Sequence, residues 1–90
     1  MKLGQTVATI GIKIAMEENE RFSFEVAHAF ARYLHHDWGN ICDEDKQLNN
    51  DAVRYQNDRI LAAYDTCEGK IYIITEWDGS ITTILFAEEY

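Results

Sequence analysis

Apolar residues in the first half of the chain recur at steps of three and four, the spacing that places them on one face of an α-helix. The clearest such segment runs from about Ser23 to Leu34 and predicts a helix. Ser23 is the predicted N-cap, and Glu25 lies in the first turn, where the helix dipole favours a negative charge. The apolar stripe of this helix consists of Phe22 or Phe24, Val26 or Ala27, Phe30, and Tyr33 or Leu34.

Two weaker helical patterns flank this segment. Ile10 and Ile14 indicate a turn of helix that ends in a polar run at residues 17–20. After a tight connection over residues 36–40, a polar helix is predicted to start at Asn40 or Asp43 and to end near Gln56. Its narrow apolar seam consists of Leu48, Ala52 and Tyr55. The connection contains Gly39, which is expected to supply a backbone conformation that other residues resist.

The rest of the chain shows β-prone runs. Residues 59–64, 71–77 and 81–86 each predict a strand, and residues 6–10 predict a further short one. Asp78-Gly79 is a strong hairpin signal, because a type I′ turn requires positive φ at both central positions. The run 71–77 is apolar on both faces, which suits the central strand of an antiparallel sheet.

The predicted fold class is therefore α+β, with residues 1–90 forming a single domain. We expect a small three- to four-stranded antiparallel sheet in the C-terminal half, with two or three N-terminal helices packed on one face. Ninety residues, 47% of them hydrophobic, are enough for one packed core and too few for two.

No apolar run approaches the roughly 20 residues that span a bilayer, and residues 1–6 lack the apolar core of a secretory signal. The expected location is the cytoplasm of a bacterial cell, with no membrane partner. Cys42 and Cys67 are then expected to be reduced thiols.

Acidic residues outnumber basic ones by 16 to 8, which gives a net charge of −8. That balance disfavours direct binding to DNA or RNA, where Lys and Arg supply most of the affinity. The densest acidic stretch is residues 37–51, in which Lys46 is the single basic residue. Its acidic members are Asp37, Asp43, Glu44, Asp45 and Asp51.

No pattern in the chain identifies an enzyme or a metal site. Zinc sites need paired ligands at short spacing, and that spacing is missing among the candidate ligands. These candidates are His28, His35, His36, Asp37, Cys42 and Cys67. There is also no nucleophile signature, and the five glycines are too scattered to form a phosphate-binding loop. We therefore expect no catalytic residues, no metal and no cofactor.

The two tryptophans are more typical of a core than of an interface in a domain this small. Alternation places Trp77 with Ile71, Ile73 and Thr75 on the face of the sheet that the helices cover. Trp38, beside Gly39, is expected to fill the junction of two helices.

Several segments resemble a family of small, mostly uncharacterised bacterial proteins found on plasmids, prophages and other mobile elements. They are Leu3-Gly4-Gln5 with Ala8-Thr9, Asp37-Trp38-Gly39-Asn40 with residues 43–46, residues 59–64, and the ending Ile71–Tyr90. One departure is Ala87, where the family pattern leads us to expect proline. The resemblance covers nearly the whole chain and implies a mobile-element setting, but it brings no active site with it.

Charge and this resemblance together predict a non-enzymatic protein-binding inhibitor. We expect it to block the basic nucleic-acid groove of a host defence nuclease complex, of CRISPR or restriction type. Carboxylates along a rigid helix can complement such a groove. The predicted partner-binding residues are Asp43, Glu44, Asp45 and Asp51, with Asp37 and Trp38 at the rim.

Two alternatives stay open. The first is a small regulatory or ligand-binding module, with an unknown ligand in a pocket between sheet and helices; Tyr64, Tyr72, Trp77 and His28 would line that pocket. The second is a homo-oligomer that pairs edge strands through residues 81–86, unless residues 6–10 cover that edge. The sequence is compatible with a monomer or a homodimer.

Overall fold

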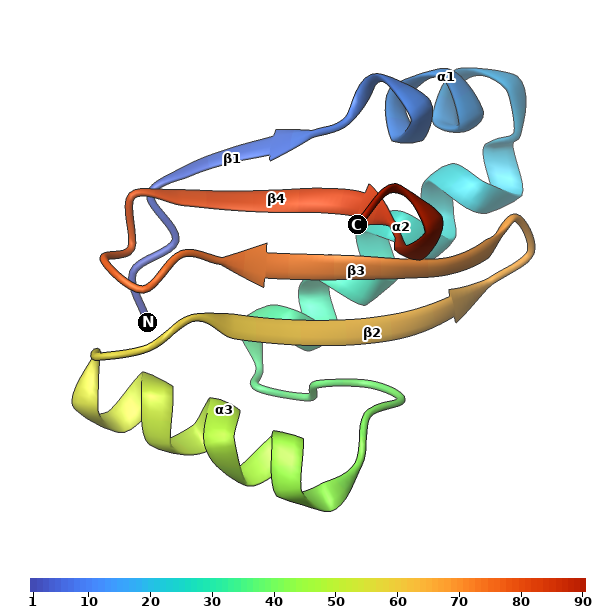
Figure 1. Cartoon of the computed structure of the whole chain (residues 1–90). Helices are drawn as coiled ribbons and strands as arrows, with labels where there is room; N and C mark the ends of the chain where they lie inside the picture. Colours follow the sequence, from blue (N-terminus) through green and yellow to red (C-terminus); the bar gives the residue numbers. More distant parts are fainter.

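Three α-helices and four strands form the fold, and three of the strands follow all of the helices along the chain (Figure 1). The computed structural model describes residues 1–90. The elements are β1 (Gln5–Ala8), α1 (Ile10–Glu18), α2 (Glu20–Leu34), α3 (Asp43–Tyr55), β2 (Ile60–Thr66), β3 (Gly69–Thr75), β4 (Ile81–Phe86) and the short 3-10 helix η1 (Ala87–Glu89). The predicted α+β class is confirmed.

The sheet is mixed and has the strand order β1-β4-β3-β2. β2 pairs with β3 and β3 with β4 in antiparallel fashion, but β1 runs parallel to β4, with Gln5 opposite Ile81 and Ala8 opposite Ile84. The prediction of a wholly antiparallel sheet is therefore wrong for β1. No hairpin dictates the direction of β1, because the entire helical half of the chain lies between it and its partner. β1 also covers β4, so residues 81–86 are not an edge through which a second copy could pair.

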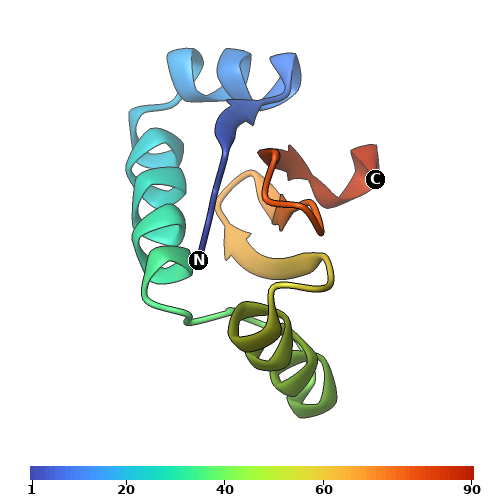
Figure 2. The same ribbon diagram turned by 90° about the vertical axis from the view of Figure 1, so that its left-hand side faces the viewer.

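α2 covers one face of the sheet, whereas α1 and α3 lie at its two edges, beside β1 and β2, so the prediction that all the helices pack on one face is wrong for α1 and α3. Figure 2 shows α2 along this face, α1 and α3 towards opposite ends, and the C-terminal turn on the other side of the sheet. Alternate strand residues point to opposite faces, so every second residue of β2 and β3 meets the helices. The buried core consists of Ile12, Phe22, Val26, Ala29, Tyr33, Trp38, Ala52, Ile60, Ala62, Tyr64, Ile71, Ile73 and Ile84.

The helix boundaries differ from the predicted ones where capping decides them. α2 begins at Glu20 because Asn19 is its N-cap and accepts a hydrogen bond from the backbone N–H of Phe22 at 3.2 Å, so the prediction of Ser23 is wrong. α3 has Cys42 as its N-cap, in place of Asn40 or Asp43, and ends next to Gln56 as expected. None of the three α-helices combines the length with the apolar composition that a membrane-spanning helix needs.

The hairpin predicted at Asp78-Gly79 is present, but its turn is longer than a type I′ turn. The N–H of Gly79 bonds the carbonyl of Glu76 at 2.9 Å, and of the residues in this turn only Gly79 has positive φ. β3 therefore ends at Thr75, and Trp77 lies in the turn with 65% of its surface exposed. The prediction that Trp77 faces the helices is wrong, because the strand alternation stops two residues before it.

A chain of buried hydroxyl groups joins α2, β3, β4 and the N-terminal segment. The Tyr33 hydroxyl lies 2.6 Å from Thr75 Oγ1, which lies 2.8 Å from Thr82 Oγ1, and Thr82 donates to the carbonyl of Leu3 at 2.7 Å. A carbonyl has no proton to give, so each hydroxyl must donate in the direction of Leu3. Burial raises the pKa of Tyr33 to about 12, which keeps its donor proton in place at neutral pH.

Candidate partner-binding surface

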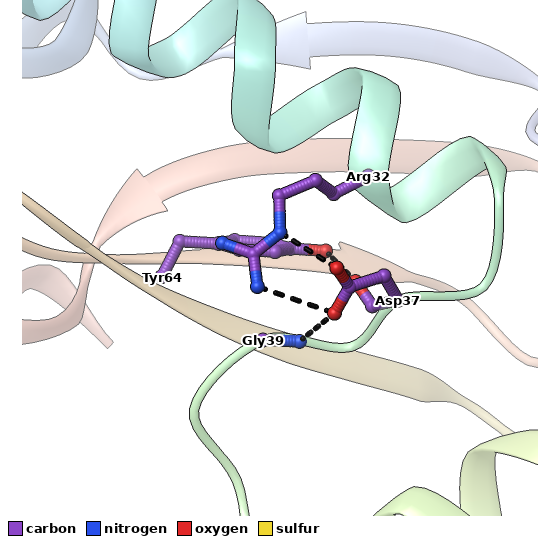
Figure 3. Close-up of polar contacts among 4 residues, drawn as sticks. All are labelled: Arg32, Asp37, Gly39 and Tyr64. Atoms are coloured by element: carbon purple, nitrogen blue, oxygen red, sulfur yellow. Dashed lines mark hydrogen bonds and ion pairs between the residues drawn. The ribbon is translucent and has the colours of Figure 1, made fainter.

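The connection between α2 and α3 is held by Asp37 (Figure 3). Its carboxylate accepts from Arg32 Nε at 2.8 Å and Nη2 at 3.2 Å, and also from the backbone N–H of Gly39 at 3.2 Å. The Tyr64 hydroxyl donates to the Asp37 carbonyl at 2.8 Å, and the Arg32 guanidinium lies over the Tyr64 ring. These hydrogen bonds, above all that from Arg32, lower the pKa of Asp37. The Asp37 carboxylate therefore bonds to groups of its own chain and holds the connection between α2 and α3 in place.

Gly39 allows this connection to touch the sheet. It has φ +75°, and a Cβ at this position would lie 2.0 Å from the Ala63 carbonyl oxygen. On either side of it, Ala63 N–H bonds the Trp38 carbonyl at 3.2 Å, and Asn40 N–H bonds the Ala63 carbonyl at 2.7 Å. The predicted special backbone role of Gly39 is confirmed.

Trp38 fills the junction of α2 and α3, as expected. Its ring is 2% exposed, packs edge-on against Tyr33 and stacks on His36. The indole N–H donates to Asn50 Oδ1 at 2.8 Å, which ties the connection to α3. The structure therefore leaves no Trp38 surface for a partner, and its predicted place at the rim of a binding surface is wrong.

α3 lies against the outer edge of β2, and a buried amide joins them. Asn49 is 5% exposed; its Nδ2 donates to the Leu61 carbonyl at 2.8 Å and its Oδ1 accepts from the Leu61 N–H at 3.3 Å. Asn49 thus gives an edge strand the two hydrogen bonds that a neighbouring strand would give it. The predicted seam is wrong except for Ala52, because Leu48 and Tyr55 are each 60% exposed.

The far side of α3 is free of other elements (Figure 1). At 100° per residue, Asp43, Glu44, Leu48, Asp51 and Tyr55 fall within an arc of about 140° around the helix axis. All five side chains are exposed, and we call them the outer face of α3; Gln47 and Arg54 are also exposed within this arc, so Arg54 places one positive charge beside the three carboxylates.

Three of the four acidic residues predicted to bind a partner are thus brought together. The fourth, Asp45, is also exposed, although it lies on the side of the helix that carries Asn49 and Ala52. Of the sixteen acidic residues in the chain, only Asp37 forms an ion pair within it. The carboxylates on α3 therefore keep their charge available to a partner.

Leu48 and Tyr55 are the members of this face that the sequence analysis misassigned. They are seven residues apart, two helical turns, so the same spacing that suggested a seam also describes an exposed stripe. The signal that separates the two is Asn49 with Ala52 and Val53, a narrow stripe centred about 100° further around the helix axis.

The alternative ligand pocket between sheet and helices does not form. Tyr64 points into the core, whereas Tyr72, paired with Ala63, lies on the opposite face of the sheet. Trp77 is in the β3–β4 turn, and His28 is exposed on α2. No three His, Cys, Asp or Glu side chains gather where they could hold a metal ion.

Replacing Asp37 is expected to remove a pH-dependent part of the stability. Because its pKa is lowered in the folded state, the contribution is complete above the ordinary carboxyl pKa of about 4 and is lost as pH falls through the lowered value. Urea unfolding of wild type and Asp37→Asn between pH 7 and pH 2 should show a stability difference that is constant above about pH 5 and shrinks below about pH 4. A difference that stayed constant down to pH 2 would assign the effect to the amide substitution itself.

Cys42 makes no side-chain hydrogen bond as the N-cap of α3, although its extended φ and ψ suit one. Cys42→Ser supplies a hydroxyl that can accept from the N–H of Glu44 or Asp45, and should raise the free energy of unfolding by about 0.5–1 kcal/mol. Thermal melts check this, with Cys42→Ala as the control that supplies no acceptor. Equal melting temperatures for the Ser and Ala variants would contradict the assignment.

Comparisons of the chain with protein-family models, with curated proteins and with solved structures find no match.

Proposed function

We propose that this protein binds a basic protein surface through the outer face of α3 and inhibits its partner by occupying a nucleic-acid groove. The supporting observation is that this helix displays its carboxylates on a side that no other element covers, with no ion pair within the chain. In the proposed setting the partner is a nuclease complex of a bacterial host defence system, of CRISPR or restriction type, in the cytoplasm.

The rigidity of α3 supports this role. The Asn49–Leu61 pair and the Trp38–Asn50 bond fix the helix to the edge of the sheet, so its carboxylates are held before a partner arrives. Preorganised charge loses less conformational freedom on binding and accelerates encounter with an opposite charge. A nucleic-acid groove is such a partner, because Lys and Arg line it.

The apolar members of the outer face add a means of anchoring. Leu48 is exposed between Glu44 and Asp51 along the helix, and Tyr55 is exposed one turn after Asp51. Tyrosine is enriched among the residues that contribute most of the binding energy at protein interfaces. A purely electrostatic contact would be screened by salt, whereas buried apolar contacts persist. We therefore expect binding that salt weakens but does not abolish when Leu48 and Tyr55 are intact.

The test is capture of the partner by tagged protein from lysate of a defence-competent bacterial host. The key variant is Glu44→Lys with Asp51→Lys, which reverses two carboxylates of the outer face and keeps Asp43 and Asp45, two of the three acidic residues that stabilise the first turn of α3 through the helix dipole. The matched control reverses two exposed acids on α1, Glu17→Lys with Glu18→Lys, which makes the same change in net charge. Circular dichroism of both variants verifies that they fold.

Retention of the partner by the α1 variant, its loss by the α3 variant and its release by added duplex DNA support the proposal. Equal loss in both variants would show that only net charge matters. Equal retention in both would remove the outer face of α3 from the interaction.

A further inference from the structure

A cavity of about 80 Å³ lies between the C-terminal end of α3, the β3–β4 turn and the N-terminal residues Met1 and Lys2. All three meet at the left-hand side of Figure 1. By volume it has room for two to three water molecules, at about 30 Å³ each. Its lining includes the apolar side chains of Val53 and Ile60, the carboxylates of Asp58, Glu76 and Asp78, and the indole of Trp77.

The lining is negatively charged. None of Asp58, Glu76 and Asp78 forms an ion pair within the chain, and these three carboxylates outnumber the two positive groups of the lining, Lys2 and the α-amino group of Met1. Asp78 is ionised at neutral pH like any exposed carboxyl group, and the hydrogen bond that it accepts from the N–H of Ser80 at 3.0 Å lowers its pKa further. The cavity therefore favours a cation.

The exposed indole restricts which cation fits. Trp77 keeps 65% of its surface exposed in the β3–β4 turn, and the face of an indole attracts positive charge. The carboxylates do not converge closely enough to hold a metal ion. A guanidinium group is planar, weakly hydrated and able to stack on an indole while donating to carboxylates on more than one side.

We infer that this cavity receives the tip of an arginine side chain of the partner protein, with its guanidinium between Trp77 and the carboxylates and its methylene groups towards the open rim. The inference rests on the proposed function, since it gives the basic partner a specific contact. The location agrees with that role: Ala52, Val53 and Gln56 of the cavity wall belong to the C-terminal end of α3 and its cap. A partner that fills the cavity can reach Tyr55 on the outer face only around the end of α3, because Val53 and Tyr55 lie about 160° apart around the helix axis.

The test is a titration of the full ¹⁵N-labelled chain with the peptide acetyl-Gly-Arg-Gly-amide, followed by two-dimensional NMR. Its matched control is the same peptide with citrulline, which keeps the shape of arginine and lacks the charge. We expect saturable shifts of the Trp77 indole N–H and of the amides of Gln56, Asp58 and Gly79 at peptide concentrations of about 1–10 mM, the range of weak single-residue contacts. The Trp38 indole signal should stay in place, because that ring is buried.

Two variants report on the two walls. Trp77→Leu should weaken the arginine peptide by about two- to fivefold, the value of a cation–π contact at an exposed site. Glu76→Gln should also weaken it, and Glu17→Gln, far from the cavity in sequence and absent from its lining, should not. An unshifted Trp38 signal in each variant verifies the fold.

Three outcomes would overturn the inference: equal shifts with citrulline, shifts spread evenly over all acidic residues, or no shift at about 10 mM peptide. Each is separable from the fate of the proposed function. If the peptide fails while Glu44→Lys with Asp51→Lys still releases the partner, the outer face of α3 binds without this cavity. If the peptide binds while Glu44→Lys with Asp51→Lys still retains the partner, the cavity binds arginine, and the outer face of α3 is not the docking surface.

Discussion

Thr82→Val is expected to lower the free energy of unfolding by about 2–4 kcal/mol, because it interrupts the buried hydroxyl chain at the member that donates to the backbone carbonyl. Thr82 is fully buried, accepts from Thr75 and donates to the carbonyl of Leu3. Valine has nearly the same shape and fills the space, so the loss comes from the polar groups that remain. The Leu3 carbonyl loses its hydroxyl donor. Tyr33 and Thr75 are left with only each other as partners, so whichever of the two hydroxyls donates, the proton of the other has no acceptor.

Tyr33→Phe is the matched comparison, and its expected cost is about 1 kcal/mol. Tyr33 is the first donor of the chain, so its removal leaves Thr75 able to donate to Thr82, and Thr82 to Leu3. Both free energies follow from urea unfolding at pH 7, with unchanged slopes showing that the unfolded states are comparable. A larger loss for Tyr33→Phe than for Thr82→Val would contradict the expectation that the bond to the Leu3 carbonyl matters most in the hydroxyl chain.

The hydrophobic pattern was sufficient for the class of fold and for most of the elements. Alternation along residues 71–75 correctly placed Ile71, Ile73 and Thr75 on one face, because a strand with a buried side must repeat every second residue. The same alternation failed at Trp77, where a turn two residues longer than expected ends the strand. The sequence therefore indicates which residues of a strand share a face. The residue at which the strand ends depends on the local turn, which the hydrophobic pattern does not describe.

The direction of β1 and the start of α2 depend on contacts that a local pattern does not contain. β1 pairs with β4 across almost the whole chain, so neither turn chemistry nor spacing indicates parallel pairing. Ser23 and Asn19 are both good N-cap residues in isolation. Asn19 is the cap because it also ends α1 and its Nδ2 donates to Glu68 Oε2 in the β2–β3 turn at 2.9 Å.

The candidate surface was predictable in part. Asp43, Glu44 and Asp51 are exposed because charged side chains stay in water unless a partner compensates them. What the sequence does not show is which carboxylates find such a partner inside the chain. Asp37 differs from the others only because the end of α2 brings Arg32 to it, five residues back along the chain.

The seam of α3 was misassigned for a physical reason. A helix that packs on the face of a sheet needs apolar side chains, and Leu48 and Tyr55 satisfy that rule on one side of α3. This helix packs on the edge of a strand, where unpaired N–H and C=O groups must be bonded. An amide side chain serves there better than a leucine, so Asn49 is inside and Leu48 outside.

Asn49→Ala is therefore the second large effect we expect, with a loss of about 2–3 kcal/mol in the free energy of unfolding. The substitution leaves the N–H and the carbonyl of Leu61 without partners at a site that α3 shields from water. Gln47→Ala, on the exposed side of the same helix, is the control and should change the stability by less than about 0.5 kcal/mol. Both values can be read from urea unfolding, and the Leu61 amide of the Asn49 variant should exchange its hydrogen faster.

Asn49→Asp separates the two hydrogen bonds. Aspartate keeps an acceptor for the Leu61 N–H, but at neutral pH it places a charged oxygen where Asn49 Nδ2 donates to the Leu61 carbonyl. We expect it to destabilise the protein at least as much as Asn49→Ala, since the remaining hydrogen bond does not offset a buried charge next to a carbonyl oxygen. A fully stable aspartate variant would show that α3 is held by Trp38 and Ala52 alone. In that case the Asn49 hydrogen bonds to Leu61 would not be what fixes α3 to the edge of β2. The rigid position of the outer face of α3 would then need another explanation.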